Sequence, residues 1–414
     1  MIGKNEELLL RLLRAALNGE RLPLSALSDP TDPSAPSDLS APAESAGAPD
    51  WEAVLREARA QTVLGPVASA LPEEAVAALP PAAAAALKTE VFQLKAKFMR
   101  ILHGQTELVA LFRTAGIPLV ILKGMAAVVY DPQPARRSMG DVDFLVPPER
   151  FADALRMMDA NGYRRQDEAV PETADDAPRH VQFFRDGVEY ELHHHFSSFG
   201  LDLEPILLDG FGRAVTREIS GREFPTLPNP ENALVLLAHI RQHLLESGLG
   251  LRQIIDWLQC LKSLTQEETA QLRAYAEEAG LDTLAGTVNR ICNRYLGTAF
   301  SWTADVDPET EDALLEHLFE RGNFGRKLGA DRPVEAVSLS VREQGLFPYL
   351  QQMGMLHWEA AQRHAFLRPF AWMHTVCRYA LKGTRLLARS PAQVRSQVSG
   401  GMKINELLRR LDLD

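Results

Sequence analysis

The spacing of apolar residues changes from helical to strand-like at Gly116. Residues 82–115 carry apolar side chains at helical spacing, and Gly116 ends that pattern. Residues 117–122 then form a short apolar run, and residues 141–146 alternate polar and apolar side chains. These patterns predict a long helix followed by two short strands.

The pattern after the second strand predicts a further helix and a hairpin. Residues 147–163 have helical spacing and end at an Asn-Gly pair. Two alternating runs, 181–184 and 188–196, flank the tight-turn sequence Arg-Asp-Gly. We therefore expect an antiparallel hairpin within a β-rich block that extends to about Pro225. From Asn229 the pattern is helical almost to the end, with breaks at Ser247-Gly248, Gly280, Asp305 to Pro308 and Pro369.

These patterns divide the chain into five segments and predict an α+β fold, with a small mixed sheet and flanking helices embedded in a mostly helical chain. The segment 1–27 contains an N-terminal helix. The segment 28–50 is rich in Pro, Ser, Ala and Asp and is expected to be a linker or long loop, because it cannot bury enough apolar surface to offset its ordering entropy. The other segments are a helical region leading into the core at 51–115, the core at 116–226 and a C-terminal helical region at 229–414.

Composition places the chain among soluble globular proteins. It has 414 residues, of which 46% are hydrophobic and 24% charged. The three cysteines are far apart, so neither a disulfide framework nor a zinc site is indicated. The first residues are charged and helix-patterned, unlike a signal peptide, and no window approaches the roughly 18 apolar residues of a membrane span. We expect a cytoplasmic protein that does not associate with membranes.

The net charge of −11 is unevenly distributed. From Ala361 onward there are ten Lys or Arg residues against three acidic ones, so the rest of the chain carries a net charge of −18. Such a body repels a polyanion, and only the tail could attract one. RNA is therefore not favoured as a partner, and a packed tail with a solvated basic face is the simpler interpretation.

Two carboxylates stand at spacing i, i+2 in the second strand. Asp141 and Asp143 would lie on one face while Val142 and Phe144 point into the core. Carboxylates held that close repel each other unless a cation or a proton lies between them, and Mg²⁺ accepts carboxylate oxygens while leaving positions for phosphates. Because an Asp-x-Asp pair is also common on solvated strands, the neighbouring residues decide between the two interpretations.

Two neighbouring groups carry the right charge for phosphates. Lys123 and Gly124 lie between the first strand and a helix, where glycine permits close approach, backbone N–H groups can face a phosphate and lysine adds charge. Arg136 and Arg137 precede the aspartates and can meet anionic oxygens. Each group alone would also fit an ordinary surface turn or surface arginines.

A third carboxylate, Glu191, lies on the predicted hairpin and shares a face with Glu189 and His193. It would complete a two-metal site, in which one metal activates the attacking hydroxyl and the other neutralises the leaving pyrophosphate. A charged edge strand is the alternative. Zinc is not favoured, because the consecutive histidines from His193 to His195 alternate faces and cannot all bind one ion.

The motif LKGMAAVVYDPQPARRSMGDVDFLV, followed by VEYELHHHF, resembles the bacterial uncharacterised nucleotidyltransferase family of the DNA polymerase beta-like superfamily. The residues that match the family pattern are Lys123, Gly124, Tyr130, Arg137, Met139, Gly140, Asp141, Asp143, Glu191, Leu192 and His193. The sequence LVLLAHIRQHLLESGLGLRQIIDWLQCL is similar to the family's His-rich and Leu-Arg-x-x-x-Asp-Trp helices. At the phosphate turn the wider superfamily usually has Ser or Gly where Met125 stands here.

The resemblance implies a polymerase beta-like core that transfers a nucleoside monophosphate from an NTP to an acceptor hydroxyl, with Mg²⁺ or Mn²⁺ as cofactor. The catalytic and metal-binding residues that it implies are Asp141, Asp143 and Glu191. The nucleotide-binding residues that it implies are Lys123, Gly124, Arg137 and His193. Glu191 would deprotonate or orient the acceptor, directly or through a metal.

The C-terminal helices are expected to recognise the acceptor. The residues that could line a cleft opposite the sheet, or could simply pack, are His239, His243, Arg252, Asp256 and Trp257. The acceptor can be a small molecule, a protein side chain or an RNA end, and the sequence leaves the preferred base and the oligomeric state open. One rival is a catalytically inactive nucleotidyltransferase-like binding or scaffold protein. A two-carboxylate phosphohydrolase ranks last, because the motif supplies no nucleophile for it.

Overall fold

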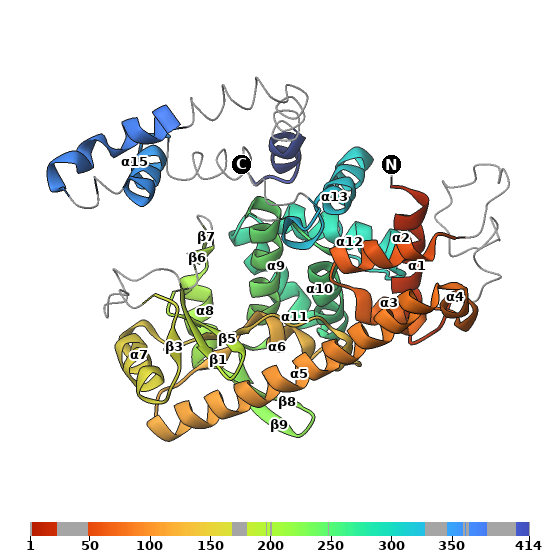
Figure 1. Cartoon of the computed structure of the whole chain (residues 1–414), viewed down its shortest axis with the longest axis horizontal. Helices are drawn as coiled ribbons and strands as arrows, with labels where there is room; N and C mark the ends of the chain where they lie inside the picture. Colours follow the sequence, from red (N-terminus) through yellow and green to blue (C-terminus); the bar gives the residue numbers. More distant parts are fainter. Residues whose placement is uncertain are drawn as a thin grey trace.

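A seven-stranded mixed sheet and a larger set of helices make up the part of the chain that the structure describes (Figure 1). This structure is a computed structural model. It describes residues 2–22, 49–167, 180–195, 197–198, 201–246, 248–327, 346–358, 361, 364–378 and 403–413. Within those ranges, none of the helices combines the length and the apolar character that a membrane crossing requires.

The N-terminal third is helical. Its helices are α1 (Lys4–Leu17), α2 (Trp51–Ala60), α3 (Leu64–Ala70), α4 (Glu73–Ala78) and α5 (Pro81–Ala115). Helix α5 begins with proline, whose missing N–H costs nothing at that position, and it ends at Gly116, which adopts a left-handed φ of 63°. The predicted end of the long helix is therefore confirmed. Most of the predicted linker at 28–50 lies outside the described residues.

The sheet has the strand order β3-β4-β5-β2-β1-β9-β8. Its strands are β1 (Val120–Ile121), β2 (Val142–Leu145), β3 (Arg164–Arg165), β4 (His180–Arg185), β5 (Val188–His193), β8 (Val215–Ile219) and β9 (Arg222–Thr226). Strand β2 runs parallel to β5 and β1 parallel to β9, whereas the other neighbours are antiparallel. The predicted hairpin is confirmed as β4 and β5, with its turn at Asp186 and Gly187, both at positive φ.

Short helices connect the strands. They are α6 (Lys123–Val128), η2 (Pro134–Arg136), η3 (Pro148–Arg150), α7 (Phe151–Ala160) and α8 (Glu204–Gly212), and a separate pair of short strands comprises β6 (Ser197–Ser198) and β7 (Leu201–Asp202). The predicted end of the β-rich block near Pro225 is confirmed, because β9 ends at Thr226, but the block also contains α8, which the sequence pattern did not predict. Glu204 and Pro205 form a helix start of the kind that places proline in the first turn. Gly210 then lets α8 pack closely against the side chain of Glu231.

The C-terminal half consists of helices. They are α9 (Asn229–Glu246), α10 (Leu251–Ser263), α11 (Gln266–Glu278), α12 (Asp282–Leu296), α13 (Pro308–Arg321), η5 (Asn323–Gly325), α15 (Leu346–His357) and η6 (Ala365–Phe370). The predicted breaks at Gly248 and Gly280 are confirmed by φ values of 102° and 66°. Ser247 lies outside the described residues, as does half of the basic tail from Ala361 onward, including residues 379–402. Residues 403–410 form a helix whose leucines are buried.

Each face of the sheet is covered by a different apolar cluster. Val142 and Phe144 of β2 pack with Phe112 of α5 in one cluster. Leu145 of β2 belongs to the other, together with Leu234 and its neighbours on α9 and α10. In Figure 1, α5 runs along one side of the sheet, and α9 and α10 stand on the other. Residues that alternate with Val142 and Phe144 therefore face α9 and α10.

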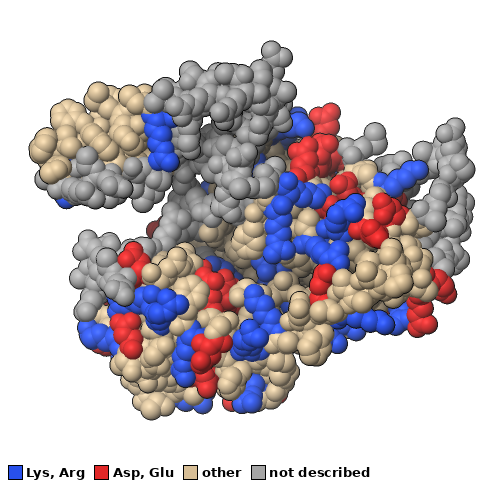
Figure 2. Space-filling model, viewed as in Figure 1, with Lys and Arg blue, Asp and Glu red and all other residues tan. Residues whose placement is uncertain are grey.

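Acidic and basic side chains are interspersed over the described surface in Figure 2. On that face the described residues form no continuous stripe of Lys and Arg. A groove that follows a nucleic-acid backbone is lined by one sign of charge. The distribution on this face does not have that character.

Candidate active site

Strands β2 and β5 bring the predicted carboxylates together. They are parallel neighbours, with Asp143 opposite Glu191 and Leu145 opposite His193. Residues that are directly opposite in a sheet project to the same face, so the three polar side chains lie on the face that α9 and α10 cover. Asp143 and His193 are buried and Glu191 is half-buried. The register of one strand pair therefore creates the cluster.

The side chains form a compact group around Asp143. His193 Nε2 lies 2.9 Å from Asp143 Oδ1 and 3.6 Å from Glu191 Oε2. Lys123 Nζ donates a hydrogen bond of 2.9 Å to the same Asp143 oxygen. One ligand atom from each of Asp143, Glu191 and His193 falls within 4.8 Å of the others.

This donor set fits a divalent cation. Two carboxylates supply the hard oxygen ligands that Mg²⁺ and Mn²⁺ prefer, and the imidazole nitrogen of His193 suits Mn²⁺ better than Mg²⁺. Asp141 stands just before β2 and is not part of the 4.8 Å group. Asp141 nevertheless interacts electrostatically with the group. Burial and the charges of Asp143 and Glu191 raise the pKa of Asp141 to about 7. A cation in the cluster would relieve this repulsion.

The other two carboxyls are ionised at neutral pH. Burial alone would raise the pKa of Asp143, but Lys123 and the hydrogen bond with His193 hold that pKa well below its usual range. Burial also opposes ionisation of Glu191, whose pKa is nevertheless lowered, chiefly by its hydrogen bond with His193. The cluster is thus a site of negative charge on a largely buried face.

The turn at Lys123 and Gly124 lies beside this cluster. Lys123 has a φ of 44°, a left-handed conformation that costs a non-glycine residue about 1–2 kcal/mol. Burial would lower the pKa of Lys123, but Asp143 and Glu191 outweigh it and raise that pKa. Met125 is 1% exposed and packs into the cluster under α5, so its side chain points into the core.

Arg137 is engaged by a residue that is distant in sequence. Its Nε and Nη2 donate to the two carboxylate oxygens of Asp256 on α10, at 2.7 and 2.6 Å. Its Nη1 donates to the Ser138 carbonyl at 3.2 Å. The pair is buried and ties the loop before β2 to α10. Contact between Arg137 and a triphosphate stays a prediction.

Helices α9 and α10 present a polar wall next to the carboxylates. The Nε2 atoms of His239 and His243 are 2.8 Å apart. Burial keeps the pKa of both imidazoles below the ordinary value, that of His243 at about 3, and the nearby charges of Lys123 and Arg252 act in the same direction. Arg252 Nη1 donates to the Ser138 carbonyl at 3.3 Å. Both histidines are therefore neutral.

Trp257 belongs to the protein interior. Its ring is fully buried, packs at 5.9 Å between centroids against Trp302, and its Nε1 donates to Asn289 Oδ1 at 2.8 Å. These contacts account fully for Trp257 as a packing residue, so it is not a candidate for acceptor recognition.

Two residues on β4 that were not predicted as site residues, Gln182 and His180, lie beside Glu191. Gln182 is opposite Glu191 in the hairpin and its Nε2 donates to Glu191 Oε1 at 3.3 Å, while His180 Nε2 lies 3.7 Å from the same oxygen. The sequence could have predicted both positions. Counting outward from the two-residue turn of the hairpin places Gln182 opposite Glu191 and His180 opposite His193.

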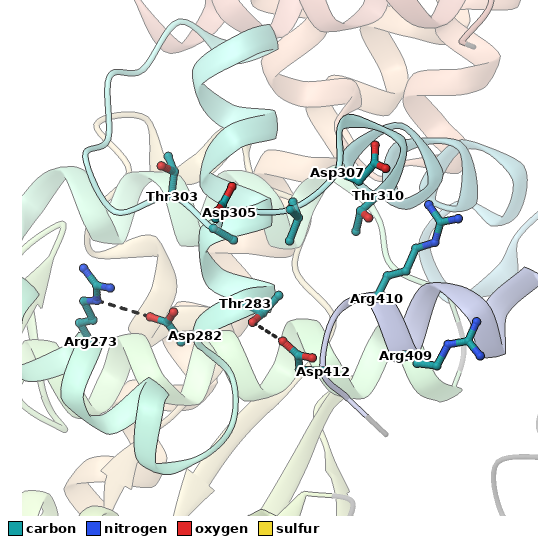
Figure 3. Close-up of a pocket in the computed structure, with 12 residues that line it drawn as sticks. Arg273, Asp282, Thr283, Thr303, Asp305, Asp307, Thr310, Arg409, Arg410 and Asp412 are labelled. Carbon is teal, nitrogen blue, oxygen red and sulfur yellow. Dashed lines mark hydrogen bonds and ion pairs between the residues drawn. The ribbon is translucent and has the colours of Figure 1, made fainter.

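A hollow of about 700 Å³ lies away from this cluster, where the helix of residues 403–410 meets α12 and α13 (Figure 3). Arg273 pairs with Asp282 at 3.5 Å, and Thr283 Oγ1 donates to Asp412 at 2.7 Å (Figure 3). Behind Asp412, the leucines of residues 403–413 are buried in the core. The hydrogen bond from Thr283 and the buried leucines hold the C-terminal segment against α12, so we assign the hollow to that junction.

Comparison with known proteins identifies the family. The model for the family described as uncharacterised nucleotidyltransferase matches residues 47–297, which is more than half of the chain. No curated protein sequence matches.

Three solved structures are similar to parts of the fold. The solution structure of the antibiotic-resistance factor ANT(2'')-Ia has 15% identity and a TM-score of 0.30, covering 46% of this chain and 92% of that chain. The crystal structure of ANT(2'')-Ia in complex with adenylyl-2''-tobramycin has 14% identity and a TM-score of 0.30, with 42% and 98% covered. An antigenic nucleotidyltransferase-like protein from Paracoccidioides brasiliensis has 14% identity and a TM-score of 0.28, with 45% and 91% covered. Because the TM-scores are low, the assignment rests on the family match over residues 47–297: the chain belongs to the uncharacterised nucleotidyltransferase family.

Proposed function

We propose that this protein transfers a nucleoside monophosphate from an NTP to an acceptor hydroxyl. The observation that carries the proposal is the group of Asp143, Glu191 and His193 on two parallel strands, beside the Lys123 turn, in a chain of the nucleotidyltransferase family. Nucleotidyl transfer needs cations near the phosphates and a group that orients the attacking hydroxyl. This face of the sheet contains groups of both kinds.

Asp141, Asp143 and Glu191 would hold Mg²⁺ or Mn²⁺ in the two-metal arrangement. The bound metal would neutralise phosphate charge and make the acceptor hydroxyl easier to deprotonate. Glu191, ionised and oriented by Gln182, would accept or direct the proton of that hydroxyl.

The nucleotide would lie along the edge of the cluster near Lys123. Lys123 and the backbone of Gly124 would meet its phosphates, and His193 would orient both Asp143 and Glu191 beside it. Arg137 would add positive charge from its paired position against Asp256. The inward direction of Met125 supports a turn surface that is free for phosphates.

The charge of the protein bears on which class of acceptor it would use. The net charge of −11 and the interspersed charges in Figure 2 favour a small molecule or a protein side chain over a long RNA. An RNA end remains an acceptor to be tested, because a few nucleotides contribute little backbone repulsion.

A transfer assay tests the proposal. Purified protein with Mg²⁺ and each labelled NTP is offered small-molecule extract, protein extract and tRNA, and label should appear in one acceptor fraction. The double variant Asp141→Asn with Asp143→Asn should lose transfer by at least about 100-fold, since both carboxylates are needed for the cations. Asp153→Asn, which alters an exposed aspartate on α7, is the matched control and should transfer normally. Absence of transfer by the wild type, or full transfer by the double variant, would overturn the proposal.

One observation favours a second candidate, a nucleotide-binding or scaffold protein without turnover. Asp143 Oδ1 is already within 2.9 Å of both Lys123 Nζ and His193 Nε2, so the carboxylate is satisfied by the protein itself. Calorimetry separates the two functions. Nucleotide binding that persists in EDTA, with no acceptor-dependent turnover, supports the second candidate, whereas Mg²⁺-dependent binding with turnover supports the first.

A further inference from the structure

Arg252 differs from Lys123 and Arg137 because it has no carboxylate partner among the residues that the structure describes. Lys123 pairs with Asp143 at 2.9 Å and Arg137 pairs with Asp256 at 2.6 Å. Arg252 makes no ion pair with any residue in the described ranges. A guanidinium has five N–H donors, and the Nε of Arg252 is buried without a hydrogen-bond partner among the described atoms.

The position of Arg252 is fixed by its surroundings. Its Nη1 donates to the Ser138 carbonyl at 3.3 Å, and its guanidinium carbon lies 5.6 Å from the ring centroid of Phe324. The Ser138 carbonyl also accepts from Arg137, so both arginines are attached to the loop that leads into Asp141. Arg252 is therefore held in the polar wall of α9 and α10, next to the carboxylates.

The positive charge of Arg252 affects the pKa values of groups in the candidate active site. Burial and the neighbouring charge of Arg137 lower the pKa of Arg252 to about 10, so it is still a cation at neutral pH. Arg252 in turn acts on the pKa of Asp141 and on those of both His239 and His243. Asp256 and Asp141 raise the pKa of Arg252 electrostatically, but neither is within ion-pair distance of it. A partly buried cation without a carboxylate in contact costs free energy, and an anion from solution can remove that cost.

We infer that Arg252 binds the β- or γ-phosphate of the nucleotide, the part that leaves as pyrophosphate. The inference rests on the proposed function. In the transfer, the acceptor oxygen forms a bond to the α-phosphorus and its proton goes to Glu191, while the bond from that phosphorus to the bridging oxygen of the β-phosphate breaks. The electron pair leaves with pyrophosphate, so negative charge increases on the group that Arg252 contacts.

Binding of three anions tests this assignment without any need for turnover. Calorimetry with Mg²⁺ measures the dissociation constants of pyrophosphate, a non-hydrolysable NTP and the matching nucleoside monophosphate, for wild type, Arg252→Gln and Arg252→Lys. Lys262→Gln, which changes an exposed cation on the same helix, is the matched control. Thermal unfolding checks that each variant is folded.

The expected result is selective. Arg252→Gln should weaken pyrophosphate and NTP binding by about 10- to 100-fold, the effect of losing a hydrogen bond to a charged group, and should leave monophosphate binding unchanged. Arg252→Lys should show a smaller loss of the same selectivity, because a point charge replaces the planar fork. Lys262→Gln should bind all three anions like the wild type.

Each other result is decisive. Pyrophosphate binding that is unchanged in both Arg252 variants overturns this inference and leaves the proposed function standing. Equal weakening of all three anions also overturns it, because the role would then be general or structural. If the wild type binds none of the anions, the proposed function itself fails. If Arg252→Gln does not fold, Arg252→Lys decides by the same criteria.

Discussion

Asp141 and Asp143 stand two residues apart, yet their pKa values move in opposite directions. Asp143 accepts hydrogen bonds from Lys123 and His193, which keep its pKa low despite burial. Asp141 is half-buried beside Asp143 and Glu191, and desolvation and their charges raise its pKa to about 7. In the absence of metal, the contribution of Asp141 to folding stability is therefore present at low pH and lost as the pH rises through about 7. A metal ligand that must lose a proton near neutral pH makes metal binding pH-dependent.

We predict that the affinity for Mn²⁺ falls as the pH falls below about 7. A proton on Asp141 competes with the metal, so affinity should fall about tenfold per pH unit for one competing proton. Calorimetric titrations between pH 6 and pH 8 measure the slope. Asp141→Asn should bind Mn²⁺ more weakly and with a flatter dependence on pH. An affinity that is constant over this range in the wild type would show that Asp141 is not a ligand.

At the scale of elements, α3 supports the loop that leads into the active site. A Cβ built on Gly65 would lie 1.9 Å from the backbone carbonyl oxygen of Arg136 in η2. Backbone cannot move aside as a side-chain end can, so only glycine permits this approach. The N-terminal helices thus position the segment that carries Arg137 and Asp141.

We predict that Gly65→Ala destabilises the protein by about 1–3 kcal/mol through overpacking and lowers the transfer rate by displacing that loop. Urea unfolding and the transfer assay measure the two effects. Gly212→Ala is the control, because a Cβ there meets nothing within 4 Å, and it should change stability by less than about 0.5 kcal/mol. If the Gly65→Ala protein has wild-type stability and transfer rate, the backbone at the contact between α3 and η2 can shift without a free-energy cost, and the prediction is wrong.

At the scale of the whole molecule, a buried ion pair joins the sheet region to the C-terminal helices. Arg137 and Asp256 are 119 positions apart in sequence and only about 8% of each side chain is exposed. Removing one partner of such a pair leaves an uncompensated buried charge, which costs more than removing both. The pair therefore couples the two halves of the chain.

A double-mutant cycle with Arg137→Met and Asp256→Asn measures this coupling. Each single variant should lose about 3–5 kcal/mol of unfolding free energy, and the double variant should lose less than the sum by about 1–3 kcal/mol. The exposed pair of Arg273 and Glu277 on α11 is the comparison, with an expected coupling of about 0.5 kcal/mol or less. Additive losses for Arg137 and Asp256 would show that the two halves are held together by other contacts.

Local features were predicted correctly from neighbouring residues. The end of α5 at Gly116, the hairpin of β4 and β5, and the inward direction of Val142 and Phe144 all follow from backbone preferences and side-chain periods that a few adjacent residues determine. Helix α8 was missed, although Glu204 and Pro205 signal its start, because the strand pattern around it was extended across them.

The amino-acid sequence by itself determined the family motif and the residues that can carry charge at the site. Only the tertiary structure decided how they meet. The parallel register that aligns Asp143 with Glu191 joins residues 48 positions apart in sequence. Arg137 and its partner Asp256 are more than twice as far apart in sequence. Neither pairing is encoded by local spacing, because it depends on how the packed faces of the sheet, α5 and α9 fit together. That packing leaves Arg252, in the wall of the site, without a carboxylate partner among the residues that the structure describes. The number of charged residues in the sequence could not have predicted this arrangement.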